Sequence, residues 1–328
     1  MKQESKTLII GAGISGLMAG KTLSSSGYLV TILEKSNGVG GRMATRRFKG
    51  GVFDHGAQFF TARDPEFLKL VDGLENEGRV RKWSHGFPES GAMTSTDGHS
   101  RYMGIGGMTS IAKQLSQDLE VHLQTAAIAI SFDGEFWHAQ TIDGRVFNGD
   151  CLILTAPIPQ SLSLLKAGGV SLEKREAELL KAIQYHPCLA ALVVLDGSSQ
   201  IPYPGGMKFE SGPIQWLGDN TQKGISPKVT AVTIHASADF SHQNFEMNSE
   251  QIAESLIKAA KPWLGGGIQD WQLHKWRYSK PMYTYPERFL KIPGYPSLIF
   301  AGDAFGGPRV EGAALSGIAA ALRILEKN

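Results

Sequence analysis

The chain has 328 residues, of which 42% are hydrophobic and 20% charged, the composition of an ordinary globular protein. Its 33 basic and 31 acidic residues leave a net charge of +2, which indicates no basic surface for nucleic acid or membrane lipid. The two cysteines, Cys151 and Cys188, exclude a disulfide framework and a CxxC motif. We find neither a secretory leader nor an apolar run of the roughly 18 residues that span a bilayer, so we expect a cytoplasmic protein.

The N-terminal segment contains the elements of a dinucleotide-binding fingerprint in their usual order. Residues 7–10 (TLII) predict a buried strand, "ISGLMAGKTLSSSG" predicts a helix that ends at Gly27, and "YLVTILEK" predicts a second strand that ends at Glu34. A glycine-rich turn between a strand and a helix, followed by an acid after the next strand, is typical of a βαβ unit that binds NAD or FAD.

Each residue of this fingerprint has a physical role. Gly11 would permit the tight turn, Gly13 the approach of the backbone to a pyrophosphate, and Gly16 close packing of helix on strand. The N-terminus of the helix, including Ile14 and Ser15, would bind the phosphates through its free N–H groups. Glu34 would accept hydrogen bonds from the adenosine ribose and repel a 2′-phosphate, and its neighbour Lys35 would also lie at the cofactor.

A second glycine turn, "SNGVGGRMATRR", follows directly. Gly40, Gly41 and Arg42 can wrap the same pyrophosphate from the other side, which an NAD dehydrogenase does not need. A glycine hairpin with a surface arginine stays open as the alternative. At the C-terminus, "SLIFAGDAFGGPRVEGAALSG" predicts a strand, Gly302 and Asp303, and a helix from about residue 310. An acid at such a strand end can bind ribitol, and a helix N-terminus can face the flavin pyrimidine, so FAD is favoured over NAD.

The middle of the chain predicts helices over 64–78, 107–119 and 249–260. Residues 120–157 predict consecutive strands with Asp-Gly turns at 133–134 and 143–144, and residues 189–240 are again rich in strands. The two β-rich pieces lie between the elements assigned to FAD. This order predicts an FAD-binding domain assembled from distant segments.

Three motifs together, "IIGAGISGLMAG", "EKSNGVGGRM" and "FAGDAF", resemble the flavin-containing amine oxidase superfamily. The segments "GGVFDHGAQFFTAR", "TIHASADFS", "HKWRYSKP" and "GGPRVEGAALSG" resemble its renalase-type branch, and the resemblance spans essentially the full length. It implies that the backbone of Ala127 holds the adenine, that Val310 and Ala313 pack against the flavin, and that Gln58 and Phe59 lie beside the isoalloxazine. It also implies substrates that are misreduced isomers of NAD(P)H.

The resulting fold prediction is α/β: a Rossmann-type FAD-binding domain of the glutathione-reductase type, with an inserted α+β substrate domain on a mostly antiparallel sheet. The predicted FAD-binding domain comprises residues 1–60, 103–158 and 292–328, and the substrate domain residues 61–102 and 159–291. Because the flavin-linking cysteine of monoamine oxidases has no counterpart after Cys188, we expect non-covalent FAD.

No catalytic residue is assigned from the sequence. The candidates for a substrate pocket are His235, Gln58, Phe59, Trp216 and Trp276. For His235 a core histidine and a pocket residue are equally open, and for the tryptophans core packing is the alternative. Arg277 and Arg309 fit either a substrate phosphate or surface salt bridges. The histidine spacing indicates no metal site, and no GxSxG elbow follows a strand.

The leading functional hypothesis is an FAD-dependent oxidase that takes hydride from a carbon bonded to nitrogen and passes electrons to O2, giving H2O2. The substrate is a small molecule, either amine-like or a dihydronicotinamide isomer. One alternative is a desaturase or protoporphyrinogen-type oxidase that acts on a large apolar substrate. Another is a non-enzymatic flavin redox sensor. The oligomeric state is left open.

Overall fold

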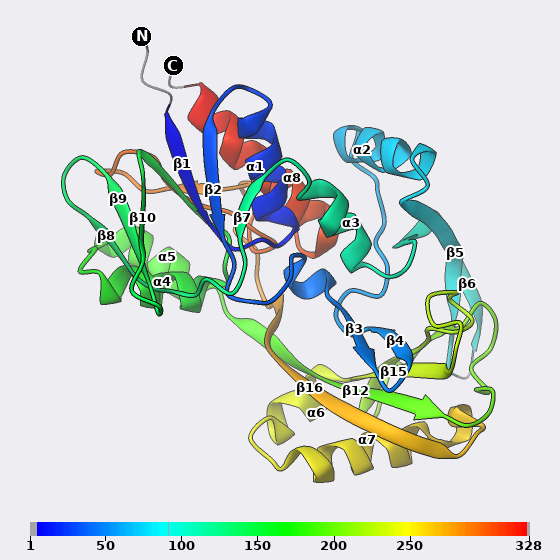
Figure 1. The fold of residues 1–328 in the computed structure, drawn as a ribbon. Helices are drawn as coiled ribbons and strands as arrows, with labels where there is room; N and C mark the ends of the chain where they lie inside the picture. The colour runs from blue at the N-terminus through cyan, green and yellow to red at the C-terminus, as the bar shows by residue number, and fades with distance from the viewer. Residues whose placement is uncertain (1–4, 91, 327–328) are drawn as a thin grey trace. The chain divides into compact units, whose positions relative to one another are not determined.

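The computed structural model describes residues 5–90 and 92–326, with only the backbone described for residues 92–96. The chain divides into two compact units, which are described separately (Figure 1). Unit 1 comprises Met1–Gly41, Ala112–Gln184 and Pro281–Asn328, and unit 2 comprises Arg42–Ile111 and Tyr185–Lys280.

A six-stranded sheet with the order β17-β18-β11-β1-β2-β7 forms the centre of unit 1. Its neighbouring strands are parallel except β17 with β18. Its strands are β1 (Lys6–Ile10), β2 (Leu29–Leu33), β7 (Glu120–His122), β11 (Cys151–Leu154), β17 (Leu290–Lys291) and β18 (Leu298–Phe300). Strands β11 and β18 are buried throughout, as expected of a parallel sheet covered on both faces.

The helices of unit 1 are α1 (Ile14–Ser24), α4 (Ile158–Ala167), α5 (Lys174–Ala182) and α8 (Arg309–Leu325). Helices α1 and α8 come from opposite ends of the chain and lie side by side (Figure 1). A Cβ added at Gly317 would lie 2.0 Å from the backbone oxygen of Ser15, so only glycine permits this close approach. The two ends of the sequence thus build one structural unit.

A separate sheet of unit 1 has the order β10-β9-β8, with β8 (Ala127–Phe132), β9 (Trp137–Thr141) and β10 (Val146–Gly149). The predicted Asp-Gly turns are confirmed, because Gly134 and Gly144 both adopt positive φ, +106° and +83°. After α4, a Cβ at Gly168 would lie 1.9 Å from the Ile130 oxygen, so the end of α4 abuts β8.

Unit 2 is built on a seven-stranded sheet with the order β16-β12-β15-β14-β13-β5-β6. Among its described pairs only β13 with β5 is parallel, which agrees with the predicted mostly antiparallel sheet. Its strands are β5 (Val80–Glu89), β6 (Ala92–Gly104), β12 (Tyr185–Leu195), β13 (Gly206–Lys208), β14 (Ile214–Asp219), β15 (Thr230–Ala236) and β16 (Ile268–Pro281). A hairpin of β3 (Thr45–Phe48) and β4 (Gly51–Asp54) forms a small separate sheet.

The two faces of this sheet bury different partners because side chains alternate along a strand. On β12, Leu189, Ala191, Val193 and Leu195 pack with Ile252 and Leu256 of helix α7 (Ser249–Leu264). Leu192 and Val194 point the other way, onto Phe53 of β4. The hairpin and α7 therefore cover opposite faces, and residues of β15 that alternate with Val232 and Ile234 face the hairpin.

The remaining helices are α2 (Pro65–Asn76), α3 (Thr109–Leu115) and α6 (Ala238–Asn244), with a 3-10 turn η1 (Gly41–Met43). The predicted start of α2 is confirmed: Asp64 caps the helix by accepting from the Glu66 N–H. Helix α3 is shorter than predicted, because a turn follows it in which Asp118 has φ +66°. Helix α7 extends past the predicted end to Leu264.

The division into units differs from the predicted domain boundaries. Residues 42–60 and 103–111 lie in unit 2, because the β3–β4 hairpin places Phe53 in the core beneath β12. Residues 159–184 and 281–291 lie in unit 1, where α4 packs on β8. These contacts join segments that are distant in the sequence, and no local pattern reveals them.

Candidate active site

The turn between β1 and α1 has the shape that the glycine spacing predicts. Gly11 has φ +107°, a conformation that L side chains rarely adopt. A Cβ at Gly16 would lie 2.0 Å from the Gly11 oxygen and 3.1 Å from Thr155 Oγ1, so close packing demands glycine there too. The predicted conformational roles of these two glycines are confirmed.

Gly13 differs from its two neighbours in the motif. Its φ of −73° and ψ of 175° suit any residue, and in the described part of the chain no atom lies within 4 Å of the place where its Cβ would be. Nothing in the fold itself therefore requires glycine at this position. A ligand that lies against the backbone at the start of α1 would require it, since a side chain would fill that space.

Two residues further on, a second feature of this turn is an unsatisfied side-chain hydroxyl. Ser15 is only 4% exposed, and its Oγ has no hydrogen-bond partner among residues 5–90 and 92–326. The hydroxyl stands in the first turn of α1, where the backbone N–H groups also lack partners within the helix. Unsatisfied donors around an open glycine fit a phosphate group.

Glu34 joins the turn between β1 and α1 to the segment that follows β2. We call these residues, together with the second glycine turn described next, the phosphate cradle. Its carboxylate accepts from the Ala12 N–H at 2.8 Å and from the Ser36 N–H at 2.9 Å, and the residue is 6% exposed. Each carboxylate oxygen has a further lone pair, and its hydrogen bond to a ribose hydroxyl stays a prediction. Its neighbour Lys35 is exposed and donates to Gln160 Oε1 at 3.5 Å.

The second glycine turn lies directly against the first. The Gly40 N–H donates to the Ala12 oxygen at 2.8 Å, and Gly40 pairs with Gly13 in a parallel bridge. Gly40 and Gly41 have φ of +116° and +54°, which explains glycine at both positions. Arg42 belongs to unit 2 and donates to the carbonyls of Tyr278 and Ser279 at 3.3 and 3.2 Å, contacts that the pyrophosphate prediction did not foresee.

The C-terminal elements of the predicted site also lie in unit 1. Gly302 has φ +133° and donates its N–H to Ser316 Oγ at 2.8 Å, which ties the end of β18 to α8. Asp303 follows, 8% exposed, and Val310 and Ala313 are buried in the first turns of α8. Ala127 begins β8 and is half-buried, and Ile14 begins α1 and is 8% exposed.

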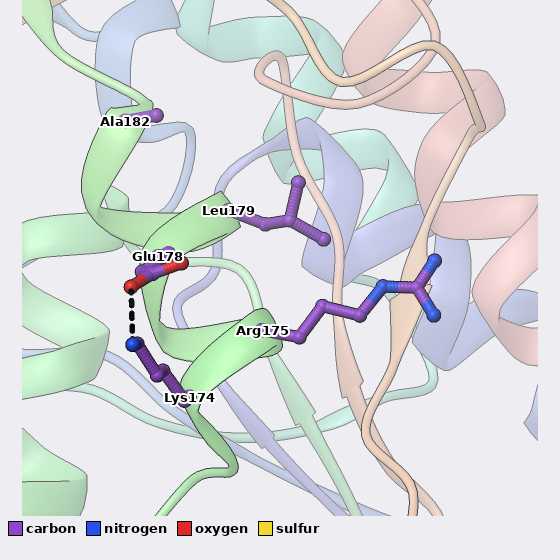
Figure 2. Close-up of a pocket in the computed structure, with 5 residues that line it drawn as sticks. All are labelled: Lys174, Arg175, Glu178, Leu179 and Ala182. Carbon is purple, nitrogen blue, oxygen red and sulfur yellow. Dashed lines mark ion pairs between the residues drawn. The ribbon is translucent and has the colours of Figure 1, made fainter.

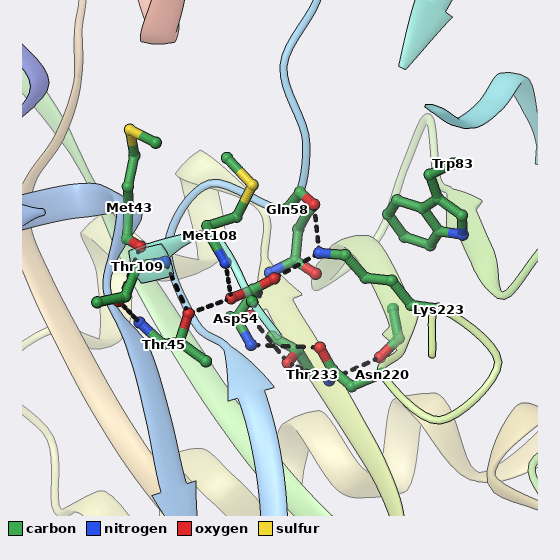
Figure 3. Close-up of polar contacts among 12 residues, drawn as sticks. Met43, Thr45, Asp54, Gln58, Trp83, Met108, Thr109, Asn220, Lys223 and Thr233 are labelled. Atoms are coloured by element: carbon green, nitrogen blue, oxygen red, sulfur yellow. Dashed lines mark hydrogen bonds and ion pairs between the residues drawn. The ribbon is translucent and has the colours of Figure 1, made fainter. Parts of the chain in front are cut away.

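In unit 2, the segment 54–60 gathers three groups of side chains, and the first is a buried ion pair (Figure 3). Lys223 Nζ lies 2.5 Å from Asp54 Oδ2, and the two side chains are 1% and 0% exposed. Asp54 Oδ1 accepts from Thr45 Oγ1 at 2.6 Å and from the Met108 N–H at 2.8 Å. Lys223 Nζ also donates to the Gln58 backbone oxygen at 2.5 Å. Burial lowers the pKa of Lys223, opposed by the Asp54 charge.

The second group is an aromatic cluster of Phe59, Trp83, Phe87 and Trp216. Phe87 and Trp216 meet edge to face with ring centroids 4.9 Å apart, a favourable geometry. Lys223 Nζ lies 4.8 Å from the Trp83 ring centroid, so this cluster adjoins the ion pair. Trp216 is 6% exposed, so it packs in the core, as the alternative to a pocket residue predicted.

The third group contains His55, His235, His274 and Trp276. The backbone oxygen of His55 accepts from Trp276 Nε1 at 2.8 Å and bonds His235 Nε2 at 3.1 Å. Burial lowers the pKa of His55 to about 3, with His274 and Arg46 adding to the shift, and burial lowers the pKa of His235 to about 4. His235 is therefore a neutral, hydrogen-bonded core histidine, one of the two readings left open.

These histidines predict acid sensitivity. An unfolded histidine binds its proton near pH 6.5, whereas His55 and His235 stay neutral in the fold down to about pH 3 and 4. The unfolded state thus binds more protons in this window, and the free energy of unfolding falls as the pH drops below about 6.5, by up to about 1.4 kcal/mol per pH unit for each histidine.

Denaturant melts of the protein between pH 7 and 5 measure this slope. The variant His235→Gln keeps an N–H donor for the His55 oxygen but cannot titrate. Its free energy of unfolding should therefore fall less steeply with pH, by up to about 1.4 kcal/mol per pH unit. An unchanged slope in the variant would contradict the assignment.

Sequence reasoning missed several members of these groups. Lys223 stands in "NTQKGIS", which reads as a solvated loop, and Trp83 and Phe87 stand in a strand without a motif. His55 and Asp54 belong to the quoted "DHGAQFF" segment, which was the available signal. Arg277, by contrast, forms an exposed ion pair with Glu246 at 3.0 Å, which matches the surface interpretation.

A hollow on the surface of α5 is a different kind of feature (Figure 2). It is lined by Lys174, Arg175, Glu178, Leu179 and Ala182. Lys174 and Glu178 are 90% and 68% exposed and pair at 4.0 Å, so water screens their interaction. The hollow holds no buried polar group of the kind found at Ser15, and we do not assign it a function.

The described residues, 5–90 and 92–326, lack two features. They contain no helix that is long and apolar enough to cross a membrane. They also contain no group of three or more His, Cys, Asp or Glu side chains that could hold a metal ion.

The cradle in unit 1, with its two adjacent glycine turns and buried acid, defines a dinucleotide-binding protein. Comparison with known families identifies the family of dinucleotide-binding proteins to which the chain belongs. The model of NAD(P)-binding Rossmann-like domains matches residues 9–74, and that of flavin containing amine oxidoreductases matches residues 89–325. The chain belongs to the flavin containing amine oxidoreductase family. It is an FAD-dependent oxidoreductase that acts on a small molecule.

Individual relatives agree with this assignment. Mouse renalase is 24% identical over 347 residues, covering 98% of this chain and 99% of its own. Putrescine oxidase of Kocuria rosea is 38% identical over 81 residues, 24% of this chain and 17% of its own. The fold is similar to that of a putrescine oxidase structure bound to putrescine, with a TM-score of 0.72 and 15% identity over 99% of both chains.

Proposed function

We propose that the protein is an oxidase that removes two electrons from a carbon bonded to nitrogen in a small substrate and uses O2 as the final acceptor, giving H2O2. FAD supplies the redox chemistry when bound, because its N5 accepts a hydride and its reduced form reacts with oxygen. The substrate is either amine-like or a dihydronicotinamide isomer, the second being the class that the renalase-type resemblance implies.

The observation that carries this proposal is the phosphate cradle of unit 1. The open space at Gly13 and the unpartnered Ser15 hydroxyl are what a bound pyrophosphate would fill and satisfy, within the residues that the structure describes. We propose that the cofactor is bound by the residues identified from the sequence: Gly11, Gly13, Ile14, Ser15, Gly16, Glu34, Lys35, Gly40, Gly41, Arg42, Gln58, Phe59, Ala127, Gly302, Asp303, Val310 and Ala313.

The side chains of unit 2 support a reaction in which the cofactor does the chemistry. Burial keeps His55 and His235 neutral through lowered pKa values, and Asp54 is committed to Lys223. These groups are poorly suited to be a general base that cycles between two charge states. Hydride transfer from an electron-rich amine or dihydropyridine needs none, so we assign no catalytic residue.

We further propose that FAD is bound without a covalent link. Both cysteines are buried, and burial raises the pKa of the Cys188 thiol to about 12. A thiol in this state is a poor nucleophile towards a flavin. Heat or acid precipitation should then leave the yellow colour in the supernatant rather than in the pellet.

The test is anaerobic stopped-flow mixing of the yellow holoprotein with 2- and 6-dihydro-NAD(P), ordinary NAD(P)H, primary amines and polyamines. We expect the dihydro isomers to bleach the flavin absorbance rapidly, and air to restore it with release of H2O2. Bleaching by amines alone would select the amine-like substrate class. Failure of every compound to bleach the flavin would overturn the proposal and favour the desaturase-type or sensor alternative.

A further inference from the structure

The chain contains two Asn-Gly dipeptides, Asn37-Gly38 and Asn148-Gly149. An asparagine that precedes glycine loses its side-chain amide most readily, because no Cβ on the next residue shields the backbone nitrogen. The loss requires this nitrogen to reach the side-chain amide carbon of the asparagine, so the local backbone decides whether it occurs. The structure places the two dipeptides, both in unit 1, in different surroundings.

Asn37 and Gly38 lie in a bend between β2 and Gly40, outside any helix or strand. Asn37 is exposed, and neither its side-chain amide nor the Gly38 N–H forms a hydrogen bond within residues 5–90 and 92–326. No atom of that part of the chain lies within 4 Å of the place where a Cβ of Gly38 would be. The Gly38 nitrogen is therefore unblocked, and the Asn37 side chain is free to rotate towards it.

Asn148 and Gly149 lie in strand β10, where the backbone is held. Asn148 pairs with His138 and Gly149 with Trp137 of the neighbouring strand β9. Gly149 is buried, and a Cβ there would lie 3.0 Å from the backbone nitrogen of Leu8. Paired strands fix the backbone dihedrals of their residues, and the attack needs a rotation at the asparagine that the ladder opposes. Strand β10 would have to open first.

We propose that Asn37 is a site of spontaneous deamidation, and that Asn148 is not. The Gly38 nitrogen attacks the Asn37 amide carbon and a C–N bond forms, while the –NH2 group leaves with the Gly38 proton as ammonia, which gives a cyclic succinimide. Water then breaks one of the two ring C–N bonds, which gives an aspartate or an isoaspartate at position 37. The net change replaces –NH2 by –OH, and no oxidant or reductant takes part.

The modified residue belongs to the second glycine turn of the phosphate cradle. Gly40, in the same turn, donates its N–H to the Ala12 oxygen at 2.8 Å and forms a bridge with Gly13. Either product adds a negative charge to this turn, and isoaspartate also lengthens the main chain, which shifts Gly40 relative to Ala12. A negative charge repels a pyrophosphate, so the affinity for FAD should fall as the protein ages. This consequence rests on the proposed function, since it assumes a pyrophosphate in the phosphate cradle, whereas the modification itself does not.

Peptide mapping of the aged holoprotein measures both sites in one digest. Trypsin, which cleaves after Lys and Arg, releases residues 36–42 and 146–166 as separate peptides, each with one Asn-Gly. After incubation in mildly alkaline buffer, mass spectrometry detects the exchange of –NH2 for –OH, and isoaspartyl methyltransferase labels the isoaspartate. We expect Asn37 to react at least about tenfold faster than Asn148, because β10 must open before Asn148 can react. Equal rates, or no reaction at Asn37, would overturn the proposal.

Asn37→Gln is the matched variant. Its longer side chain has to close a larger ring, which forms far more slowly, so ageing should leave the peptide 36–42 unchanged. FAD titrations of fresh and aged protein then measure the consequence. In wild type we expect the dissociation constant to rise with the modified fraction, by up to about fivefold, the scale of one exposed charge interaction. In Asn37→Gln it should not change with age, and fresh Asn37→Asp should show the rise without ageing.

The titrations separate the modification from its effect. Equal loss of FAD affinity in aged wild type and aged Asn37→Gln would place the cause elsewhere and refute the effect on the cofactor. Modification of Asn37 with unchanged affinity would refute it as well. Failure of every substrate to bleach the flavin would overturn the proposed reaction, but would leave the deamidation and its effect on FAD binding standing.

Discussion

Replacing Gly13 by valine should give a folded protein that no longer retains FAD. The backbone at Gly13 has φ −73° and ψ 175°, which valine adopts readily, and a Cβ there meets nothing within 4 Å in the described chain. The side chain would instead occupy the space assigned to the pyrophosphate. We expect the FAD dissociation constant to rise at least about 100-fold, with a circular dichroism spectrum like that of the wild-type apoprotein.

Gly73 provides the control for this experiment. It also has open space around its Cβ position, but it lies within helix α2 of unit 2 and is not part of the glycine motif. Gly73→Ala should leave FAD binding intact and stabilise the helix by about 0.5–1 kcal/mol. Retention of FAD by Gly13→Val at wild-type affinity would show that the cradle does not hold the pyrophosphate.

Removing either member of the buried ion pair should strongly destabilise unit 2. In Lys223→Met the Asp54 carboxylate loses its counter-charge at 0% exposure, keeping only its bonds from Thr45 and Met108. In Asp54→Asn the buried ammonium loses its anion. Breaking a buried pair from one side costs about 3–5 kcal/mol, because it leaves an uncompensated charge in the interior.

The double variant Asp54→Asn/Lys223→Met distinguishes charge from packing. Since it removes both charges, it should be less destabilised than the sum of the single variants. Guanidinium melts followed by tryptophan fluorescence give the free energies, and hydrogen exchange of β4 and β15 localises the effect to unit 2. The comparable double change at the exposed pair Lys174 and Glu178 should stay within about 0.5 kcal/mol. Additive losses at Asp54 and Lys223 would contradict the coupling.

The sequence alone predicted the parts of this protein whose cause is local. The strand, glycine turn, helix and acid from β1 to Glu34 follow one another directly, and each glycine conformation depends on its immediate neighbours. The cap of α2 and the Asp-Gly turns between β8, β9 and β10 are local in the same way. The local pattern also predicted the C-terminal strand and the helix that follows Asp303.

Tertiary structure decided what depends on burial. Lys223 looks like a surface lysine in its own loop, and only its packing against β4 makes it the partner of Asp54. The ring of His235 likewise meets the backbone oxygen of His55 only because two distant segments pack together. A polar group acquires its charge state and its need for a partner from the groups that exclude water around it, and these come from remote parts of the chain.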